Sequence, residues 1–514
     1  MTDLPWLTIL MVVPLVGSLV VAILPSAETA KQTALGISLV TLALGVVAAA
    51  QFQTGSGEQF QLVEEHSWIP QFGVSYALGV DGIALTLILL ALVLTPVCLL
   101  AAWNDLEGEA ASGRRVQTYF ALMLVLVTFM VGVFAATDVF LFYVFFEAML
   151  IPVYFMIGSF GRGERRRYAA IKFLLYSLAG GLIMLAGVIY LYILGPRGDE
   201  GFLIDNLTGL GLDPTTERWL FISFFIALAV KAPMFPVHTW LPDAAEHAPA
   251  GTSVLLVGVL DKVGTFGMIA LLLPLFPNAS VWAAPVVCAL AVISILYGAI
   301  LAIGQEDLMR LVAYTSVSHF GFIVLGIFAF TATSTTGASF YMFNHGLSTG
   351  GLFLLGGMLA ARGGGSQRID DFTGLVKPTP MLAGFFLIVG LSALGLPGLS
   401  PFVSEFLVLV GSFGTQPSLT VLGTLGVVLA ALYILWTVQR IFTGPVPDEL
   451  ADTPDLDIRE RGVIAPLIAI MLVFGFYPEP ALELVREPAQ LTVAEVAQVP
   501  NAVVIASGDE GSAS

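Results

Sequence analysis

Long apolar runs follow one another through almost the whole of this sequence. Fourteen of them are long enough to cross a hydrocarbon core, which takes roughly 20 residues. They occupy residues 5–25, 32–51, 78–102, 117–136, 138–158, 168–194, 218–241, 250–273, 281–302, 310–331, 338–360, 381–412, 419–442 and 461–477. Because hydrocarbon offers no partner to a free backbone group, such runs must be helices. The sequence therefore predicts an all-α polytopic membrane protein with about 14 transmembrane helices.

The composition excludes an ordinary soluble protein. Of the 514 residues, 57% are hydrophobic and only 11% are charged, whereas soluble domains average about 25% charged residues. The first run follows "MTDLP", which carries an acid instead of a basic segment, so we expect a membrane helix there and not a cleaved signal. The net charge of −17 resides mainly in loops and in the C-terminal tail, so it does not indicate a nucleic-acid partner.

Lysine and arginine positions predict the orientation. Of the 20 such residues, fourteen fall in loops that follow odd-numbered runs, and only Arg197, Arg218 and Arg486 fall on the other side. Since cytoplasmic loops are enriched in these residues, both termini are expected on the non-cytoplasmic side.

Redox cofactors find few ligands in this chain. Its two cysteines, Cys98 and Cys288, lie singly in apolar runs, whereas an iron–sulfur cluster takes about four thiolates. No Gly-rich turn between a strand and a helix is present to hold a dinucleotide. A haem between His319 and His345 is an alternative, but a lone helix histidine more often forms a hydrogen bond. We therefore expect no cofactor and no metal in this chain.

Ionisable residues at membrane depth are the candidate functional groups. Each charge at the bilayer centre costs roughly 2.5–3.5 kcal/mol on insertion scales, so several of them indicate a proton path. The candidates for proton transfer are Glu147, Lys231, Lys262, His319, His345 and Glu405, with His238, His247 and Asp261 as secondary candidates.

Structural explanations also exist for several of these residues. Glu147 and Lys231 could form a pin between helices, and His319 could merely bond a nearby serine or carbonyl. His238 lies at the cytoplasmic end of the seventh run, where an interfacial histidine is common. Asp81, Asp138 and Asp243 lie at helix ends and are expected to be caps or loop anchors.

Prolines are expected to break two of the helices, the seventh and the twelfth. Pro233 and Pro236 cannot donate to the carbonyls four residues earlier, so the seventh helix should open beside Lys231. Pro397 and Pro401 should open the twelfth helix one turn before Glu405. Burial disfavours the charged form of a lysine while a nearby carboxylate favours it, so Glu147 could switch Lys231 between holding and releasing a proton.

Paired broken helices are typical of transporters built from inverted repeats. We expect two inverted five-helix repeats, helices 4–8 and 9–13, because helices an odd number of steps apart point in opposite directions. The expected division is residues 1–116 for helices 1–3, 117–273 for the first repeat, 281–442 for the second, and 443–514 for helix 14 with an acidic tail.

Several motifs carry a family resemblance between about residues 80 and 442. They are "VKAPMFPVHTWLPDA", "LDKVGTFG", "LMRLVAYTSVSHFGF", "FNHGLSTGGLFLLGG" and "GLPGLSPFVSEF". This set resembles the antiporter-like subunits of respiratory complex I, a family shared with multisubunit cation/proton antiporters. The resemblance implies a glutamate–lysine pair at Glu147 and Lys231, a lysine carrier at Lys262 and a terminal carrier at Glu405.

The glutamate in helix twelve resembles the subunit M branch, because the L and N branches usually place a lysine there. Two departures stand out: the usual histidine of "LPDAHxEAP" is Ala245 here, with a new one at His247, and the apolar residue before the helix-eight lysine is Asp261. The resemblance implies partners among L-like and N-like paralogues, small membrane subunits and a peripheral redox arm that holds NADH, flavin, iron–sulfur clusters and quinone. It also implies the inner (plasma) membrane of a bacterium.

Two functions remain open at this point. The chain is a proton-translocating membrane-arm subunit of an NADH–quinone oxidoreductase, or it belongs to a cation/proton antiporter without redox partners. The buried ionisable residues do not separate these two, because both would use the same carriers. A purely structural scaffold would require every buried charge to be a pin.

Overall fold

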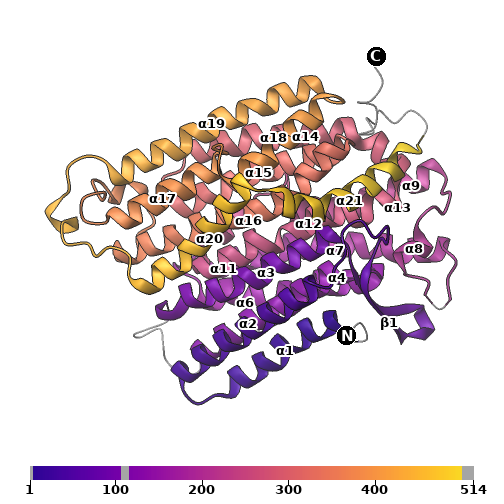
Figure 1. Cartoon of the computed structure of the whole chain (residues 1–514), viewed down its shortest axis with the longest axis horizontal. Coiled ribbons are helices and arrows are strands. Elements are labelled where there is room, and N and C mark those ends of the chain that lie inside the picture. Colours follow the sequence, from indigo (N-terminus) through magenta and orange to yellow (C-terminus); the bar gives the residue numbers. More distant parts are fainter. Residues whose placement is uncertain (1–3, 106–114, 199, 500–514) are drawn as a thin grey trace.

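Helices running side by side make up most of the molecule (Figure 1). The structure, a computed structural model, describes residues 4–105, 115–198 and 200–499. The helices of its first half are α1 (Trp6–Ile23), α2 (Ala27–Ala49), α3 (Gly82–Ala101), α4 (Arg115–Ala135), α5 (Val139–Ala148), α6 (Leu150–Phe160), α7 (Arg166–Leu194), α8 (Ile204–Leu207), α9 (Pro214–Lys231) and α10 (Trp240–His247). Then come α11 (Ala250–Leu255), α12 (Lys262–Gly267) and α13 (Leu273–Leu275), joined by the π-helical segments η4 (Leu256–Leu260) and η5 (Met268–Leu272).

The second half contains α14 (Pro277–Ile303), α15 (Leu308–Phe328), α16 (Ala332–Arg362), α17 (Pro380–Ala393), α18 (Ser400–Phe413), α19 (Pro417–Phe442), α20 (Ile458–Phe476) and α21 (Glu479–Ala497). Each of the fourteen apolar runs thus contains helix. Ten spans in the described residues are long and apolar enough to cross a membrane, or eleven if the bent pair α20–α21 is one span. The predicted polytopic helical fold is confirmed.

The other four runs have physical reasons to miss that threshold. The seventh run is broken after α9 and the twelfth between α17 and α18, as the prolines predict, and the fourteenth bends by 72° into α21. The eleventh run, α16, is 31 residues long but rich in Ser, Thr and Gly. Nearly all of α16 is buried, so protein and not lipid surrounds it.

Three elements differ from the sequence-based expectation. A β-hairpin pairs β1 (Gln61–Ile69) with β2 (Val74–Val80), so the third run contains the end of a strand, and its helix begins only at Gly82. Residues 479–497, expected in an acidic tail, form the helix α21. This helix packs against α16 and α3. Hydropathy does not reveal the hairpin or α21, because the two strands are too short and α21 is too polar to resemble a span.

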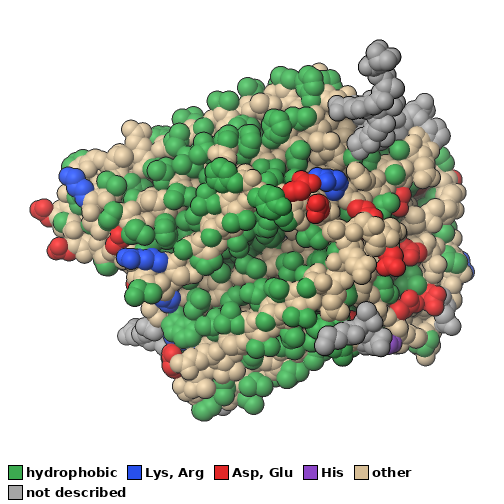
Figure 2. Space-filling view, in the orientation of Figure 1, with side chains coloured by type: hydrophobic (Ala, Val, Ile, Leu, Met, Phe, Trp, Pro, Cys, Tyr) green, Lys and Arg blue, Asp and Glu red, His purple; other side chains and the backbone are tan. Residues whose placement is uncertain are grey.

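The surface agrees with a lipid-facing belt. In Figure 2, hydrophobic side chains cover the flank of the helices, while most charged side chains lie toward the two ends. Burial separates the helices into an inner and an outer group. Within Leu308–Phe328, 94% of an apolar 18-residue segment is buried, whereas the figure for Ala27–Ala49 is 28%. The inner group, which includes α12, α15 and α16, carries Lys262, His319 and His345.

Two expected helix caps are confirmed. Asp81 accepts a hydrogen bond from the backbone of Ala84 at 2.7 Å and so caps α3. Asp138 accepts from the backbone of Leu141 at 2.8 Å, which caps α5, and from that of Ser75 at 2.9 Å. Asp138 therefore joins β2 to the helix that carries Glu147.

We predict that Asp138→Ala destabilises the subunit by about 1–2 kcal/mol, because it removes a cap and leaves the Ser75 amide without its partner. The midpoint of thermal unfolding of the purified protein should fall. Glu58→Ala, a change in the loop before β1, is the control. A midpoint unchanged in Asp138→Ala would show that the hairpin holds its place without this carboxylate.

Candidate functional site

The break between α9 and α10, in the seventh apolar run, places Lys231 at a helix end inside the protein. Helix α9 ends at Lys231 and α10 begins at Trp240. The Ala229 carbonyl, expected to be free, accepts from the Met234 amide at 3.1 Å. The Val230 carbonyl accepts from the Trp240 indole at 3.0 Å. These bonds correct the expectation of an open, polar break: the chain rebonds part of its own backbone around Lys231.

The Lys231 ammonium has few partners for a fully buried charge. It donates to the Phe146 carbonyl at 3.4 Å and lies 4.5 Å from the centre of the Phe146 ring. The acids whose charges act on it are Glu147 and Asp261. Neither forms an ion pair with it within 4.0 Å among the described residues, which weakens the explanation of Glu147 and Lys231 as a fixed pin.

Glu147 occupies a space that a glycine leaves open. It lies at the end of α5, just before the short interruption at Met149. Its Oε1 atom is buried without a hydrogen-bond partner. A Cβ atom at Gly181 of α7 would collide with that oxygen. The packing therefore admits the carboxylate only because residue 181 has no side chain.

Lys262 and His345 form the most direct contact between two candidates. The Lys262 ammonium lies 2.6 Å from Nδ1 of His345 and 2.5 Å from the Val257 carbonyl, and both side chains are fully buried. The helices meet closely here, because a Cβ on Gly346 would lie 2.8 Å from the Gly258 carbonyl. A proton can pass between these two nitrogens along one hydrogen bond.

His319 is the next ionisable residue after His345, in the direction of the break between α17 and α18. Its ring lies 5.3 Å from that of His345, centre to centre, at an angle of 87°. The backbone of Ala393, the last residue of α17, lies near enough to act on the charge of His319, whose Nδ1 atom is buried without a hydrogen-bond partner. The Tyr341 ring lies 5.9 Å from it. At Nδ1 the structural explanation of a bond to a nearby serine or carbonyl therefore fails.

Glu405 lies against the other side of this break. Its residue is 6% exposed, and a Cβ on Gly395, which has a φ of +74°, would collide with its carboxylate. The Asn344 amide next to His345 donates to the Ser400 carbonyl at 3.0 Å and to the Ser404 hydroxyl at 3.2 Å. These bonds hold α18, and with it Glu405, against α16.

The secondary candidates divide into two kinds. His238 is buried with no hydrogen-bond partner for either ring nitrogen, among the rings of Phe235, Tyr297 and Tyr314. His247 bonds the Asp243 carbonyl through Nδ1 at 2.9 Å and lies beside the loop at Gly163. His238 is therefore near the break, whereas His247 is the last residue of α10.

An ion network around Asp243, next to His247, was not predicted from the sequence. Asp243 accepts from Lys172 at 2.7 Å and from Arg310 at 2.8 Å, and Arg310 also reaches Glu246 at 2.8 Å. Burial opposes ionisation of Asp243, but the bonds from Lys172 and Arg310 outweigh it and hold its pKa below the usual value. The network ties α7, α10 and α15 together, so Asp243 is more than a local anchor.

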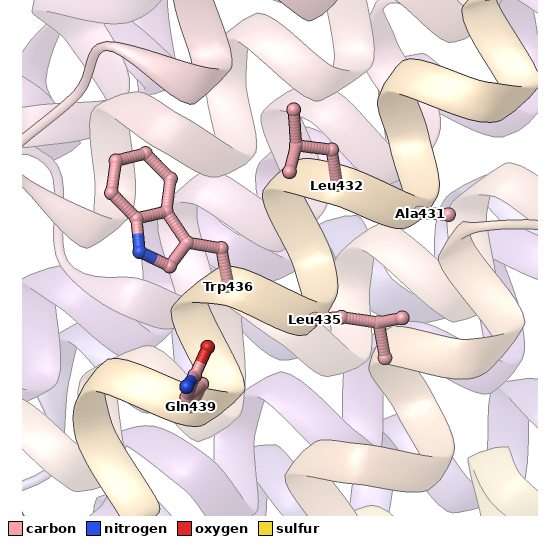
Figure 3. Close-up of a pocket in the computed structure, with 5 residues that line it drawn as sticks. All are labelled: Ala431, Leu432, Leu435, Trp436 and Gln439. Atoms are coloured by element: carbon pink, nitrogen blue, oxygen red, sulfur yellow. The ribbon is translucent and has the colours of Figure 1, made fainter.

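In the described structure, neither a metal site nor a groove along α19 adds a further group of ionisable side chains. In the described part of the chain no group of three or more His, Cys, Asp or Glu side chains is placed to hold a metal. A shallow groove of about 510 Å³ runs along α19, and Figure 3 shows that its labelled side chains include one polar residue, Gln439. This groove lies apart from the buried ionisable residues.

Comparison with known proteins decides the family. A family described as NADH:quinone oxidoreductase/Mrp antiporter, transmembrane, matches residues 136–432, a segment that contains Glu147, Lys231, Lys262 and Glu405. The chain belongs to this family. The resemblance found in the motifs is confirmed.

Curated relatives within the family cover nearly the whole chain. The protein named NADH-quinone oxidoreductase subunit M from Mycobacterium tuberculosis (strain CDC 1551 / Oshkosh) is 46% identical, over 97% of this chain and 96% of its own length. The protein of the same name from Rhodobacter capsulatus is 38% identical, over 93% of this chain and 94% of its own length.

Solved structures share the fold. A chain of respiratory complex I from Thermus thermophilus with bound NADH superposes with a TM-score of 0.86 at 31% identity, over 95% of this chain and 99% of that one. A chain of the Mrp complex from Dietzia sp. DQ12-45-1b gives a TM-score of 0.83 at 22% identity, over 96% and 99%. The second likeness concerns the fold alone.

We predict that Gly181→Ala lowers proton translocation several-fold, because the added methyl group forces the Glu147 carboxylate away from its place. Gly36→Ala is the matched control, since a Cβ at Gly36 meets nothing within 4 Å. Translocation in membrane vesicles, normalised to the amount of subunit, is the measurement. Equal rates in both variants would show that the position of Glu147 does not matter.

Proposed function

We propose that this chain is a proton-translocating membrane-arm subunit of an NADH–quinone oxidoreductase, of the subunit M type. The observation that supports this most is a series of ionisable side chains within the family segment, which runs from the partly buried Glu147 through buried lysines and histidines to the buried Glu405. A protein without a transport role has no reason to bury so many charges with so few fixed partners. The chain itself supplies carriers of protons, and electron transfer takes place in partner subunits.

The first part of the path is the pair of Glu147 and Lys231. Their charges act on each other without a fixed ion pair. When the carboxylate is close, the ammonium form of Lys231 is stabilised; when it is distant, burial favours release of the proton. A small movement of either helix can therefore load or unload this lysine.

The middle of the path runs through Lys262, His345 and His319. The hydrogen bond between Lys262 and His345 gives the proton a direct transfer step. Neutral His345 has one protonated ring nitrogen, and its Nε2 atom is buried without a partner. The proton can leave from that nitrogen toward His319, whose ring is the next titratable group.

The final carrier in this proposal is Glu405. It lies beyond the break between α17 and α18, and Tyr341 is near both His319 and Glu405. A carboxylate here accepts a proton from the histidines and releases it when water reaches it. His238, buried near the cytoplasmic end of the seventh helix, is suited to proton uptake, whereas His247 serves the fold of its loop.

Partners supply what this chain lacks. Peripheral subunits are proposed to hold NADH, flavin, iron–sulfur clusters and quinone, so this chain needs no cofactor of its own. Its neighbours in the bilayer are proposed to be L-like and N-like paralogues and small membrane subunits. The protein is multi-pass, and we place it in the bacterial plasma membrane with both termini on the non-cytoplasmic side, as the arginine-rich loops favour.

The two-repeat organisation is part of the same proposal. Helices 4–8 within 117–273 and helices 9–13 within 281–442 each contain one broken helix with an ionisable residue beside the break. Residues 1–116 and 443–514 flank the repeats. The alternative function, a subunit of a cation/proton antiporter, is not favoured, because the relatives with 46% and 38% identity are named subunit M of NADH-quinone oxidoreductase.

We expect Lys231→Ala and Lys262→Ala each to reduce NADH-driven proton translocation by about 10²-fold, the lower limit for loss of a general acid–base group. Lys377→Ala, which changes an exposed loop lysine, is the control. Proton uptake by inverted membrane vesicles containing equal amounts of the complex is the measurement. Wild-type translocation in both lysine variants would refute the proposed path.

Glu405 allows a test that separates the identity of the carrier from its presence. Glu405→Lys keeps a titratable group and should retain part of the translocation. Glu405→Gln has the same shape as the wild type but cannot carry a proton, so translocation should fall at least about tenfold. Proton uptake by inverted membrane vesicles after NADH addition is the measurement, and full uptake in Glu405→Gln would remove this residue from the path.

A further inference from the structure

Asp261 is a fully buried carboxylate that the path above does not use. It precedes Lys262 and has no exposed surface. Although it occupies the N-cap position of α12, its side chain caps no backbone amide. Both carboxylate oxygens are buried without a hydrogen-bond partner.

The contacts of neighbouring residues show which way Asp261 faces. Gly264, three residues later, lies so close to α9 that a Cβ there would be 2.5 Å from the Ala232 amide and from the Leu228 carbonyl. Residues three apart share one side of a helix. Asp261 therefore faces α9 and the end that carries Lys231, whereas Lys262 bonds His345 on α16.

The helix changes its form directly before Asp261. The segment before Asp261, η4, is π-helical, and the Asp261 amide bonds the Leu256 carbonyl five residues back at 3.0 Å. Such wide turns insert an extra residue into a helix and occur often at functional sites. Here such a turn lies directly before two consecutive ionisable residues that face two different helices.

Lys262 and Lys231 are the charged groups that act on Asp261. Neither lysine forms an ion pair with it within 4.0 Å in the part of the chain that the structure describes. Glu64 shows what a structural buried carboxylate looks like in this protein, since it accepts from the Leu7 amide at 2.7 Å and from the Thr8 hydroxyl at 2.5 Å. Asp261 has no such fixed bonds, although leaving a buried acceptor unsatisfied costs about 1–3 kcal/mol.

We propose that Asp261 carries protons between Lys231 and Lys262. In the first step the Lys231 ammonium gives a proton to the Asp261 carboxylate, which leaves a neutral amine and a carboxylic acid. In the second step the acid gives that proton to neutral Lys262, which restores the carboxylate. One proton moves from one lysine to the other, and the total charge of the three groups stays constant. Each lysine reaches the acid by moving its flexible four-carbon chain.

This inference rests on the proposed path, and three variants test it in the assembled complex. Asp261→Asn keeps the shape of the side chain but cannot carry a proton. Asp261→Glu keeps a titratable carboxyl group. Glu64→Gln is the matched control, because it also changes a buried carboxylate to an amide but lies outside the path. Protons taken up per NADH oxidised, in inverted vesicles with equal amounts of subunit, are measured for all three.

We expect Asp261→Asn to lower the ratio of protons to NADH at least fivefold, Asp261→Glu to restore more than half of it, and Glu64→Gln to leave it unchanged. Normal translocation in Asp261→Asn, with loss in Lys231→Ala and Lys262→Ala, would overturn the role of Asp261 alone. Loss in both Asp261 variants would also overturn it and indicate a packing role. Normal translocation in Asp261→Asn, Asp261→Glu, Lys231→Ala and Lys262→Ala alike would refute the path itself.

Discussion

The cost of holding charge away from water governs this structure. A charged side chain at membrane depth is tolerated when protein surrounds it and a partner compensates it. The described helices accordingly place Lys231, Lys262, His345 and Glu405 inside the bundle and leave apolar side chains on its flank. Helix α16 shows the effect most clearly, since its Ser- and Thr-rich sequence suits a helix that touches protein on all sides.

The fold and the principal carriers could be predicted from the sequence because both depend on strong signals. Apolar runs locate the helices, prolines locate the two breaks, and a lysine in the middle of an apolar run stands out in any window. The hairpin β1–β2 and the helix α21 could not be found in this way, since neither has the length or the apolar character of a span. The freed carbonyl of Ala229 was expected from proline chemistry, but a new bond from Met234 depends on the path of the chain after the break.

Contacts between distant residues were also beyond the reach of the sequence. The sequence does not indicate that Lys262 contacts His345, which is 83 residues away. It also does not indicate that the missing side chain of Gly181 leaves room for Glu147. The Lys172–Asp243–Arg310 network was missed for the same reason, although the acidic pair in "LPDAAEH" followed by a lone arginine near the start of a span is a usable signal in retrospect. Asp261 was visible only as a departure from a motif, and its unpaired oxygens required three dimensions.

The close approach of Gly258 and Gly346 has a consequence for control of the path. Backbones in contact leave little freedom for the helices that carry Lys262 and His345 to separate, so these two side chains stay within reach of each other even when Lys262 moves toward Asp261 and back. Gly264 holds the helices of Lys231 and Asp261 equally close, but Glu147, Lys231 and Asp261 form no fixed ion pairs with one another in the described structure. The side chains of Glu147, Lys231 and Asp261, which no ion pair fixes, are therefore the part of the path where a gate coupled to another subunit can open or close a link.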